Sequence, residues 1–459
     1  MRKSFASAFR QISRALGPEV LDFTETTCAA HAGDKWFATH MPDAVAFPRD
    51  AESVSKILSI ANRHGLPVTA RGAGYGYVGG AVPERGGLVL SLMRMNRIIE
   101  IDPDDFVAVV QPGVITADLQ NKVEKVHRYY PPDPASRADC SIGGNIATNA
   151  GGPRCLKYGV TREYVLGLQV VLADGTIVRT GGRTHKNKTG FDLTKLFVGS
   201  EGMLGVVTEA TLKLLPLPPY RACLGVGFPS MKQAIEAIQN IFSAGVLPSA
   251  LELADEFTLV AARKRTGSRL LAGCRAHFIV ELDGQERSVR VEVPALQKII
   301  SKSKPVFVTR ALGSAEAEKI WQLRREFSYS LRDTGLTKLN EDIVVPRGKL
   351  EALFDFTARL QKKHGLQVAC FGHAGDGNIH VNLMVDMNAP GTEAKCDDAL
   401  DELFKRVIDL GGAITGEHGI GLAKKRWWPV AVSPEGRHLH ALVKNALDPH
   451  GILNPGKFL

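Results

Sequence analysis

The apolar residues have helical spacing in the segment that begins at Asp50, DAESVSKILSIANRHG. Residues three and four apart lie on one face of a helix, and the apolar ones here do so: Val54, Ile57, Leu58 and Ala61. Asp50 is suited to accept a hydrogen bond from the first turn, and Gly65 is suited to end the last turn. The pattern predicts a helix between these two residues.

Shorter runs after this helix have the composition of strands. LPVTA, GGLVLSL and FVAVVQPG alternate or run apolar, and glycine-rich turns separate them. The first half of the chain is therefore predicted to have α/β organisation with glycine loops.

A proline-rich stretch, LLPLPPY at residues 214–220, predicts a domain boundary, because proline removes backbone donors and restricts its neighbours. Beyond it, the apolar spacing predicts helices at residues 231–242, 315–331 and 349–364. Strand-like runs alternate with them at residues 276–282 and 368–384. The second half is predicted to be a separate α+β domain.

Length and composition indicate a soluble globular protein, since 459 residues with 44% hydrophobic content suffice for two or three buried cores. No apolar run is long enough to span a membrane, and no secretory signal is recognisable. We expect a cytoplasmic protein, with peripheral attachment to an inner membrane left open. The basic opening MRKSFASAFRQISRALG reads as an amphipathic helix, with a mitochondrial transit peptide as the alternative.

Cysteine usage and charge exclude several classes of protein. The 7 cysteines are scattered and never form a C-x-x-C pair, which argues against a disulfide framework and against iron–sulfur ligation. The net charge of +9 is dispersed, so we expect no nucleic-acid partner. An anionic substrate or an acidic partner fits the charge equally well.

Three glycine-rich stretches stand out in the first half. RGAGYGYVGG at residues 71–80 follows a strand and can aim backbone N–H groups at a diphosphate, although a plain structural turn is the alternative. PPDPASRADCSIGGNIATNAGGPRCLKYG is a mostly non-periodic segment of 29 residues, and loops of this length are usually functional. FVGSEGMLGVVTEATLKLLP turns through glycines into an alternating strand.

Taken together, these motifs from about residue 42 to 217 resemble the FAD-binding domain of the vanillyl-alcohol-oxidase superfamily, the p-cresol methylhydroxylase (PCMH) type. The resemblance implies two α+β subdomains with FAD between them. Its FAD-contacting residues would be Arg71, Gly72, Ala73, Gly74, Tyr75, Gly76, Pro132, Ser136, Ser141, Gly144, Asn145, Asn149, Gly202, Gly205 and Val206. Some members attach the flavin to a histidine where this chain has Tyr75, so FAD is expected to be non-covalent.

The stretch VACFGHAGDGNIHVNLM at residues 368–384 carries two histidines between strand-like arms. A hairpin would bring His373 and His380 together, and a period of two would put His380, Asn382 and Met384 on one face. Glu417 and His418 follow in GGAITGEHGIGLAKKRW. Two histidines and a glutamate are the ligand set of many catalytic zinc sites, whereas any one histidine alone would be an ordinary structural residue.

These motifs resemble the C-terminal domain of FAD-dependent D-2-hydroxy acid dehydrogenases. The sequence motifs are similar to those of the FAD subunit of bacterial glycolate oxidase. The resemblance implies that His373, His380 and Glu417 bind a divalent metal, zinc first with manganese or iron as alternatives. It implies His418 as the catalytic base, Asn382 as a substrate contact and Arg324 as the ligand of the substrate carboxylate. The family's downstream lysine corresponds to Lys338, or the spacing aligns Asn340 instead.

The closing LDPHGILNPGKF resembles the family's returning tail, in which Asn454 and Lys457 approach the flavin, although an ordinary turn is the alternative. The predicted fold class is α+β, with an N-terminal segment, a FAD-binding domain, a substrate-binding cap domain and a tail that packs on the FAD domain. The corresponding ranges are 1–41, 42–217, 218–439 and 440–459.

The predicted activity is the FAD-dependent oxidation of glycolate or D-lactate to the 2-oxo acid. D-2-hydroxyglutarate as substrate, oxygen as acceptor, and a non-catalytic flavin electron-transfer subunit are the alternatives. Because the chain has no cysteine cluster, electrons are expected to pass to a quinone, a cytochrome or an iron–sulfur partner. A homodimer and a hetero-oligomer both remain open.

Overall fold

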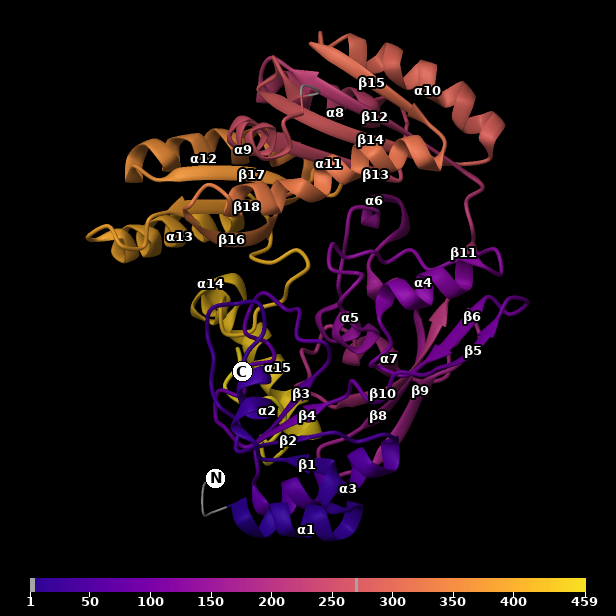
Figure 1. Cartoon of the computed structure of the whole chain (residues 1–459), viewed down its shortest axis with the longest axis vertical. Helices are drawn as coiled ribbons and strands as arrows, with labels where there is room; N and C mark the ends of the chain where they lie inside the picture. The colour runs from indigo at the N-terminus through magenta and orange to yellow at the C-terminus, as the bar shows by residue number, and fades with distance from the viewer. Residues whose placement is uncertain (1–4, 269–270) are drawn as a thin grey trace. The chain divides into compact units, whose positions relative to one another are not determined.

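The computed structural model describes residues 5–268 and 271–459 of the chain (Figure 1). These residues form two compact units. Unit 1 comprises the described residues up to 151 together with residues 160–217 and 417–459, and unit 2 comprises residues 152–159 and the described residues of 218–416. The sequence predicted boundaries after residues 41, 217 and 439. The structure divides the chain after residue 217 and again after residue 416, because the backbone from Ile420 onward is hydrogen-bonded within unit 1.

The first sheet of unit 1 has four strands in the order β1-β2-β4-β3, and only β1 runs antiparallel to its neighbour. Its strands are β1 (Leu21–Asp22), β2 (Ala44–Ala46), β3 (Val68–Arg71) and β4 (Leu88–Ser91). Helices α1 (Ala6–Leu16), α2 (Glu25–Ala30) and α3 (Ala51–His64) surround it. The predicted helix after Asp50 is confirmed as α3, since Asp50 accepts from Ser53 N at 2.8 Å and Gly65 ends it at φ +58°.

The second sheet of unit 1 is antiparallel, with the order β5-β6-β10-β8-β9. Its strands are β5 (Ile98–Asp102), β6 (Val107–Val110), β8 (Val165–Val171), β9 (Ile177–Gly181) and β10 (Val206–Lys213). A smaller pair joins β7 (Arg128–Tyr129) to β11 (Leu215–Pro216). One hydrophobic core serves both larger sheets, because α3 packs on β8 and contributes to a cluster that also contains Val206 and Leu88.

Three short helices accompany this second sheet: α4 (Thr116–Glu124), α5 (Ile142–Thr148) and α7 (Leu193–Phe197). A fourth, α6 (Cys155–Tyr158), belongs to unit 2 and contacts β13 there. The 29-residue segment that the sequence predicted as mostly non-periodic contains α5 and α6. The sequence did not predict α5, because glycines and small residues dominate this segment. The helix begins after Ser141, whose Oγ accepts from Gly144 N at 3.4 Å.

The last part of unit 1 contains α14 (Trp428–Ala431) and α15 (Pro434–Leu447), followed by the C-terminal tail. The tail runs parallel to β3 at one bridge, between Val68 and Leu453. Val68 N donates to Ile452 O at 2.8 Å, and Asn454 N donates to Val68 O at 2.7 Å. The tail is therefore hydrogen-bonded to the strand that leads into the first glycine loop.

Unit 2 is built on a seven-stranded sheet in which every pairing is antiparallel, with the order β15-β12-β14-β13-β17-β18-β16. Its strands are β12 (Tyr220–Phe228), β13 (Ala250–Asp255), β14 (Ala276–Gly284), β15 (Phe307–Leu312), β16 (Thr337–Val344), β17 (Gln367–His373) and β18 (Asn378–Val385). The predicted hairpin is confirmed as β17 and β18, which pair through His373 and Asn378 next to the turn.

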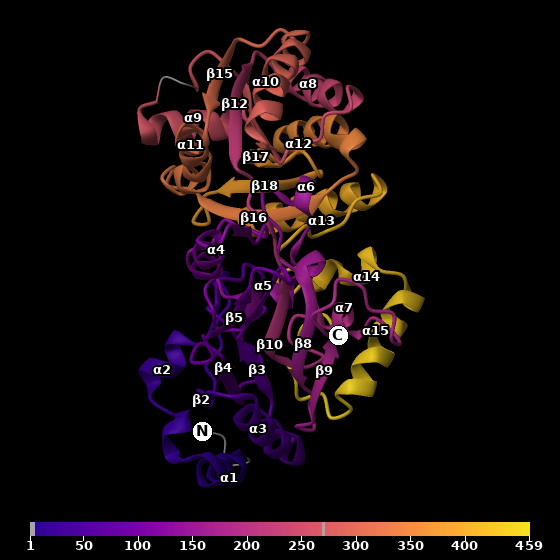
Figure 2. The same ribbon diagram turned by 90° about the vertical axis from the view of Figure 1, so that its right-hand side faces the viewer.

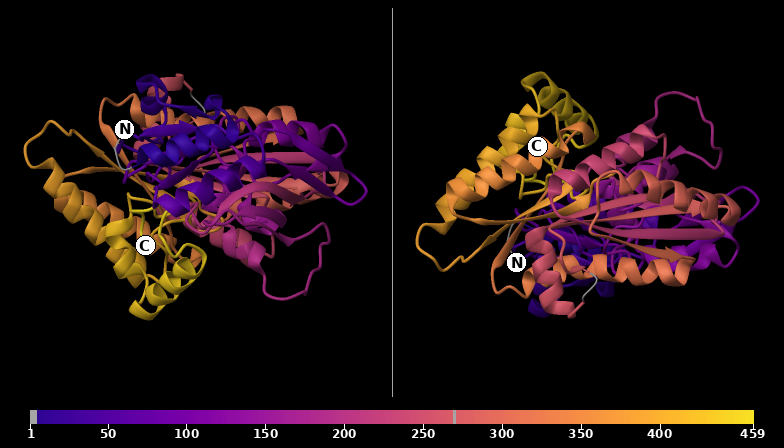
Figure 3. Two further views of the ribbon diagram at one scale, coloured as in Figure 1. Left: turned by 90° about the horizontal axis from the view of Figure 1, so that it is seen from below. Right: turned by 90° about the horizontal axis from the view of Figure 1, so that it is seen from above.

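Helices lie on both faces of this sheet (Figures 2 and 3). One face carries α9 (Glu256–Thr266) and α11 (Ser314–Arg332), and the other carries α8 (Met231–Ser243), α10 (Glu286–Ser301), α12 (Leu350–His364) and α13 (Thr392–Asp409). The helices predicted at 231–242, 315–331 and 349–364 are confirmed within about a residue at each end. Because both faces are covered, β18 is buried at all 8 positions.

No helix among residues 5–268 and 271–459 is long and apolar enough to cross a membrane.

Candidate active site

One side chain joins the first two glycine-rich stretches. Ser141 Oγ accepts from Ala73 N at 3.3 Å and from Gly144 N at 3.4 Å, so the loop after β3 lies against the first turn of α5. A Cβ at Gly72 would overlap this oxygen, and only glycine allows the approach. The structure therefore brings together Gly72, Ala73, Ser141 and Gly144.

The Arg71 side chain is folded back beside its own loop. Its guanidinium donates to Gly33 O and, at 3.5 Å, to Ala30 O, and a Cβ at Gly74 would overlap it. Burial lowers the pKa of this guanidinium, with nearby Asp34 opposing the shift. Gly74 has φ +74°, which glycine adopts without strain. The loop is thus a tight backbone turn with a cation beside it.

The next residues of the loop contact the N-terminal part of unit 1. The Lys35 ammonium lies 4.4 Å from the centre of the Tyr75 ring, and Gly76 O accepts from Lys35 N at 2.9 Å. In the second stretch, Pro132 O accepts from Gln120 Nε2 at 2.9 Å, and Ser136 is half-buried.

Three predicted cofactor residues make internal contacts in this structure. Asn145 Nδ2 donates to Thr116 Oγ1 at 2.6 Å, and Asn149 Oδ1 accepts from Arg162 N at 2.8 Å. Val206 belongs to the hydrophobic core. The side chains of these residues support the loops, while their roles toward the cofactor stay predictions.

The third glycine-rich stretch turns sharply before β10. Glu201 and Gly202 have φ values of +50° and +72°. A Cβ at Gly205 would lie 2.5 Å from Val170 Cγ1, so the close packing of this turn on β8 requires glycine. Asn454 of the tail connects this turn to the end of the first glycine loop, because its Nδ2 donates to Glu201 O at 2.7 Å and to Gly80 O at 3.0 Å.

Two further polar groups of the tail are buried. Asn454 Oδ1 has no hydrogen-bond partner among the described residues. Lys457 is fully buried and donates to Val82 O at 2.6 Å. Burial lowers the pKa of Lys457 to about 8, although the nearby carboxylates of Glu84, Glu201 and Asp34 oppose the shift.

The segment after Glu417 is held by a buried carboxylate. Glu201 Oε1 accepts from Ile420 N at 2.7 Å, and Glu201 Oε2 accepts from Gly421 N at 2.8 Å. Val78 O of the first glycine loop accepts from Leu422 N at 2.7 Å. His418 then stacks on Tyr77, with the ring centres 5.2 Å apart. These contacts fix the predicted base beside the first glycine loop.

The two histidines of the hairpin lie side by side. Phe371 pairs with His380 across the strands, and the ring centres of His373 and His380 are 5.5 Å apart. Both side chains are buried, with 5% and 7% exposure. The predicted approach of these histidines across the turn is confirmed.

Glu417 completes a possible metal-binding group with this pair. One potential ligand atom from each of His373, His380 and Glu417 lies within 4.8 Å of the others. Glu417 and His418 are consecutive, and Glu417 Oε1 lies 3.7 Å from His418 Nε2. Two imidazoles and one carboxylate form the donor set that the sequence predicted.

A buried carboxylate that the sequence analysis missed connects His373 to Arg324. Glu252 Oε1 accepts from His373 Nδ1 at 2.5 Å, and Glu252 Oε2 accepts from Arg324 Nε at 2.6 Å. Burial alone would raise the pKa of Glu252, but His373 and Arg324 lower it to about 2. The visible signal was an acidic residue inside the apolar strand ALELAD.

Arg324 keeps part of its guanidinium available. Its Cζ atom lies 4.8 Å from the centre of the Phe371 ring, and its side chain is 11% exposed. Among the described residues, the Nη groups of Arg324 make no hydrogen bond, since only Nε is used. Lys338 Nζ donates to Ser328 Oγ at 2.8 Å, and Ser328 lies on α11, the helix that carries Arg324.

Asn382 is fully buried on β18, the strand that also carries His380. Its Nδ2 donates to Ala369 O at 2.9 Å and to His380 O at 3.1 Å, while Oδ1 has no partner among the described residues. Asn340 is the cross-strand partner of Asn382, and its Oδ1 has no partner in the same part of the chain. The pair presents two acceptors in a buried place.

Asp342 is a second carboxylate that the sequence analysis missed. It is fully buried and accepts from Asn378 Nδ2 at 2.6 Å, Thr415 Oγ1 at 3.0 Å and Gly416 N at 2.8 Å. It therefore holds both the hairpin turn and the residues that precede Glu417. The signal was again an acidic residue entering an apolar run, EDIVV.

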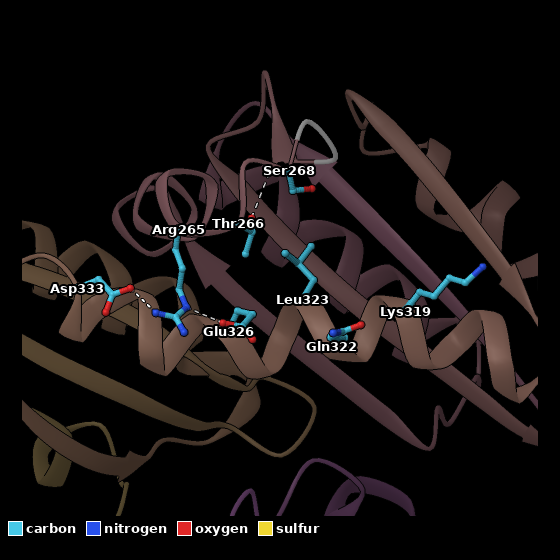
Figure 4. Close-up of a pocket in the computed structure, with 8 residues that line it drawn as sticks. All are labelled: Arg265, Thr266, Ser268, Lys319, Gln322, Leu323, Glu326 and Asp333. Atoms are coloured by element: carbon cyan, nitrogen blue, oxygen red, sulfur yellow. Dashed lines mark hydrogen bonds and ion pairs between the residues drawn. The ribbon is translucent and has the colours of Figure 1, made fainter.

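A separate pocket of about 600 Å³ lies between α9 and α11 of unit 2 (Figure 4). It is lined by Arg265, Thr266, Ser268, Lys319, Gln322, Leu323, Glu326 and Asp333. Arg265 donates to Glu326 at 2.7 Å and pairs with Asp333. None of the predicted site residues lines this pocket, and four of its eight lining residues carry a charged side chain.

Known families match both parts of the chain. Residues 217–458 match the family described as FAD linked oxidases, C-terminal domain, and residues 42–181 match the FAD binding domain. The chain belongs to the FAD-linked oxidase family. The predictions of FAD as cofactor and of an oxidoreductase are confirmed.

Relatives similar to this chain include proteins named for an activity. The glycolate oxidase subunit GlcD of Bacillus subtilis is 39% identical over 451 residues, which are 97% of this chain and 95% of the relative. The D-lactate dehydrogenase of Archaeoglobus fulgidus is 35% identical over 414 residues, 90% of each chain. The relatives are thus matched over nearly their whole length.

Solved structures share the fold. A p-cresol methylhydroxylase with substrate bound superimposes with a TM-score of 0.80 at 19% identity, covering 100% of this chain and 97% of that one. An alkyldihydroxyacetonephosphate synthase has a TM-score of 0.77 at 20% identity, covering 98% and 84%. At these identities the likeness concerns the fold alone, and it confirms the predicted PCMH-type architecture.

Proposed function

We propose that this FAD-linked oxidase converts a D-2-hydroxy acid, glycolate or D-lactate, to the 2-oxo acid. The observation that supports this most directly is one polar cluster in unit 2. It combines a candidate metal ligand, His373, with a guanidinium, Arg324, on the two oxygens of Glu252. A 2-hydroxy acid offers a carboxylate and a chelating hydroxyl, which match these two groups. Relatives named glycolate oxidase subunit and D-lactate dehydrogenase support the same substrate class.

The residues of unit 1 fit FAD. The backbone at Gly72 and Gly74 leaves no room for side chains, and such turns accept a diphosphate on their N–H groups. Asn454 Oδ1 is a buried acceptor without a partner among the described residues, which suits a donor on a bound cofactor. When bound, FAD supplies a two-electron acceptor for hydride at N5. We infer non-covalent binding, because Tyr75 stands where some family members carry the linking histidine.

The residues of the hairpin fit a divalent metal. Because His373 Nδ1 donates to Glu252, we assign Nε2 as the metal-binding atom of His373, with His380 and Glu417 as the other ligands. Two histidines and a carboxylate suit zinc, and manganese and iron are alternatives. When bound, such a metal lowers the pKa of a coordinated hydroxyl.

Arg324 and Lys338 provide the positive charge for the substrate carboxylate. The free Nη groups of Arg324 can bind both carboxylate oxygens. Lys338 is close enough for the charge of Arg324 to lower its pKa, after burial and Arg332, to about 8. We therefore assign the second cation to Lys338, with Asn340 as the neighbour of Asn382. We assign Asn382 as a further substrate contact, because its buried Oδ1 has no partner among the described residues.

His418 is the proposed base. It removes the hydroxyl proton as the hydride leaves Cα, which yields the 2-oxo acid without a high-energy alkoxide or oxocarbenium species. Its orientation is fixed by stacking on Tyr77 and by the hydrogen bonds that hold residues 420–422. The electrons then leave for a quinone, a cytochrome or an iron–sulfur subunit.

Anaerobic flavin bleaching tests this function. The purified holoenzyme is mixed with glycolate, D-lactate, L-lactate and D-2-hydroxyglutarate, before and after removal of metal with EDTA. We expect glycolate or D-lactate to bleach the flavin, and metal removal to slow this at least tenfold. Bleaching by L-lactate alone, or rates indifferent to a verified loss of metal, would contradict the mechanism.

Two variants separate the base from a general loss of structure. His418→Asn should slow bleaching 100-fold or more, the scale of a lost general base. His438→Asn, on the exposed side of α15, should leave the rate unchanged. If no D-2-hydroxy acid bleaches the wild-type flavin, the chain is instead the non-catalytic electron-transfer subunit.

A further inference from the structure

Glu252 occupies an unusual position for a carboxylate. Its side chain is 1% exposed, and its two oxygens serve different partners, His373 Nδ1 at 2.5 Å and Arg324 Nε at 2.6 Å. Both partners belong to the proposed active site, and Glu252 itself contacts neither a proposed ligand atom for the metal nor the free Nη groups of Arg324.

We propose that Glu252 is a positioning residue that orients the metal ligand and the substrate-binding arginine together. Metal affinity and substrate-carboxylate affinity then depend on one buried side chain. This inference rests on the proposed function, since it takes His373 as a metal ligand and Arg324 as the substrate cation.

The contact with His373 selects one form of the imidazole. A carboxylate accepts hydrogen bonds, so Nδ1 carries the proton and Nε2 presents its lone pair. The hydrogen bond also fixes the rotation of the ring, which packs edge to face on His380 at 5.5 Å. Removal of such outer partners of metal-binding histidines typically weakens metal affinity 10-fold to 100-fold.

The contact with Arg324 fixes the direction of the guanidinium. Nε is held by Glu252, and the guanidinium carbon lies 4.8 Å from the Phe371 ring centre and 5.7 Å from the Phe327 ring centre. Only the outer edge, with the Nη groups, is then left for a ligand. Without Glu252, the guanidinium would lose its only hydrogen bond among the described residues and could rotate between the rings.

The fold places Glu252 between these partners. Residues two apart on β13 share a face, and Ala250 and Ala254 pack with residues of α11, which carries Arg324. Within the sheet, β13 pairs with β17, which ends at His373. Two alanines flank the glutamate, so the long carboxylate has room to reach both elements.

A purely structural ion pair is the competing explanation, and the chain offers a matched control. Glu281 lies on the neighbouring strand β14 with a fully buried side chain. Its carboxylate accepts from Arg154 at 2.8 and 3.0 Å and from Trp321 Nε1 at 2.6 Å. None of these partners is a proposed site residue, so Glu281→Gln reproduces the loss of a buried ion pair alone.

The first measurement is metal affinity without turnover. Zn²⁺ or Mn²⁺ is titrated into stripped FAD-loaded protein against a chromophoric chelator. We expect Glu252→Gln to weaken binding 10-fold to 100-fold and Glu281→Gln to change it less than threefold. Equal affinity in Glu252→Gln and wild type, or equal weakening in both variants, would overturn the inference.

The second measurement is the split between KM and kcat in metal-saturated protein. Arg324→Met should raise KM for the substrate and leave metal affinity within threefold, whereas Glu252→Gln should move both quantities. A Glu252→Gln variant with unchanged KM would refute the link to Arg324. His373→Ala should abolish metal binding, and its failure to do so would instead refute the proposed metal site.

A shorter carboxylate provides a variant that keeps the charge. Glu252→Asp retains the ion pair but lacks the length to reach both partners. We expect it to fold if Glu252→Gln does not, and to lose metal affinity or raise KM at least fivefold. Wild-type values for both quantities in Glu252→Asp would contradict the positioning role.

Discussion

Replacing Glu201 by glutamine tests how the segment that carries His418 is held. The two oxygens of Glu201 accept from Ile420 N at 2.7 Å and Gly421 N at 2.8 Å, immediately after the proposed base. Glutamine has nearly the same shape, but it offers only one acceptor and turns an NH₂ group towards the other backbone N–H. One of the two amides therefore loses its partner in a buried place.

The expected size follows from these two bonds. A hydrogen bond to a charged group contributes about 1.5–3 kcal/mol, and an unsatisfied buried donor costs about 1–3 kcal/mol. Burial raises the pKa of Glu201, so the wild-type carboxylate is itself costly to bury, and glutamine recovers part of the loss. We expect local opening of residues 419–422 to become easier by about 2 kcal/mol, or roughly 30-fold in amide exchange.

Hydrogen exchange measured by mass spectrometry on a peptide that spans residues 416–424 gives the direct readout, and kcat should fall at least tenfold. Glu209→Gln is the control, because Glu209 lies on β10 and pairs with the exposed Arg179 at 2.7 Å. Unchanged protection of the peptide in Glu201→Gln, or an equal loss in Glu209→Gln, would refute the anchoring role.

Three further results are expected. Because burial, Arg332 and Arg324 lower the pKa of Lys338 to about 8, KM should rise up to about tenfold per pH unit above pH 8, and Lys338→Arg should flatten the rise in a pH series of initial rates. Burial lowers the pKa of His277 from 6.5 to about 4, so the unfolded state binds this proton first as the pH falls. This group should remove about 2 kcal/mol of unfolding free energy between pH 7.5 and 5, and urea titrations of His277→Gln should lack that loss. Trichloroacetic acid should release all FAD into the supernatant, whereas a yellow pellet would refute non-covalent binding.

The regular elements could be predicted from the sequence where local signals agree. Helix α3 has an apolar face, an aspartate cap and a terminal glycine, and its observed bounds match the prediction. Helix α5 was missed because IGGNIAT has no apolar period and two glycines, both of which oppose a helix. Its start depends on the Ser141 cap and on packing against the loop after β3, and neither is visible in a short window of sequence.

The candidate metal ligands could be predicted for a different reason. His373 and His380 lie on one hairpin, so period and turn chemistry alone bring them together, and the structure places their rings 5.5 Å apart. Glu417 required the resemblance to a family, because no local rule connects it to a hairpin that ends more than thirty residues earlier in the sequence.

The residues that hold the site in place could be suspected but not assigned. Glu252 and Asp342 are acidic residues inside apolar strands, and burying an unpaired carboxylate is costly, so each had to have partners. The partner of Glu252, however, is 121 residues away at His373, and sheet order rather than chain order makes them neighbours. A break in the apolar pattern of a strand therefore signals that a buried polar contact exists, and only the strand order reveals which functional side chain that contact orients.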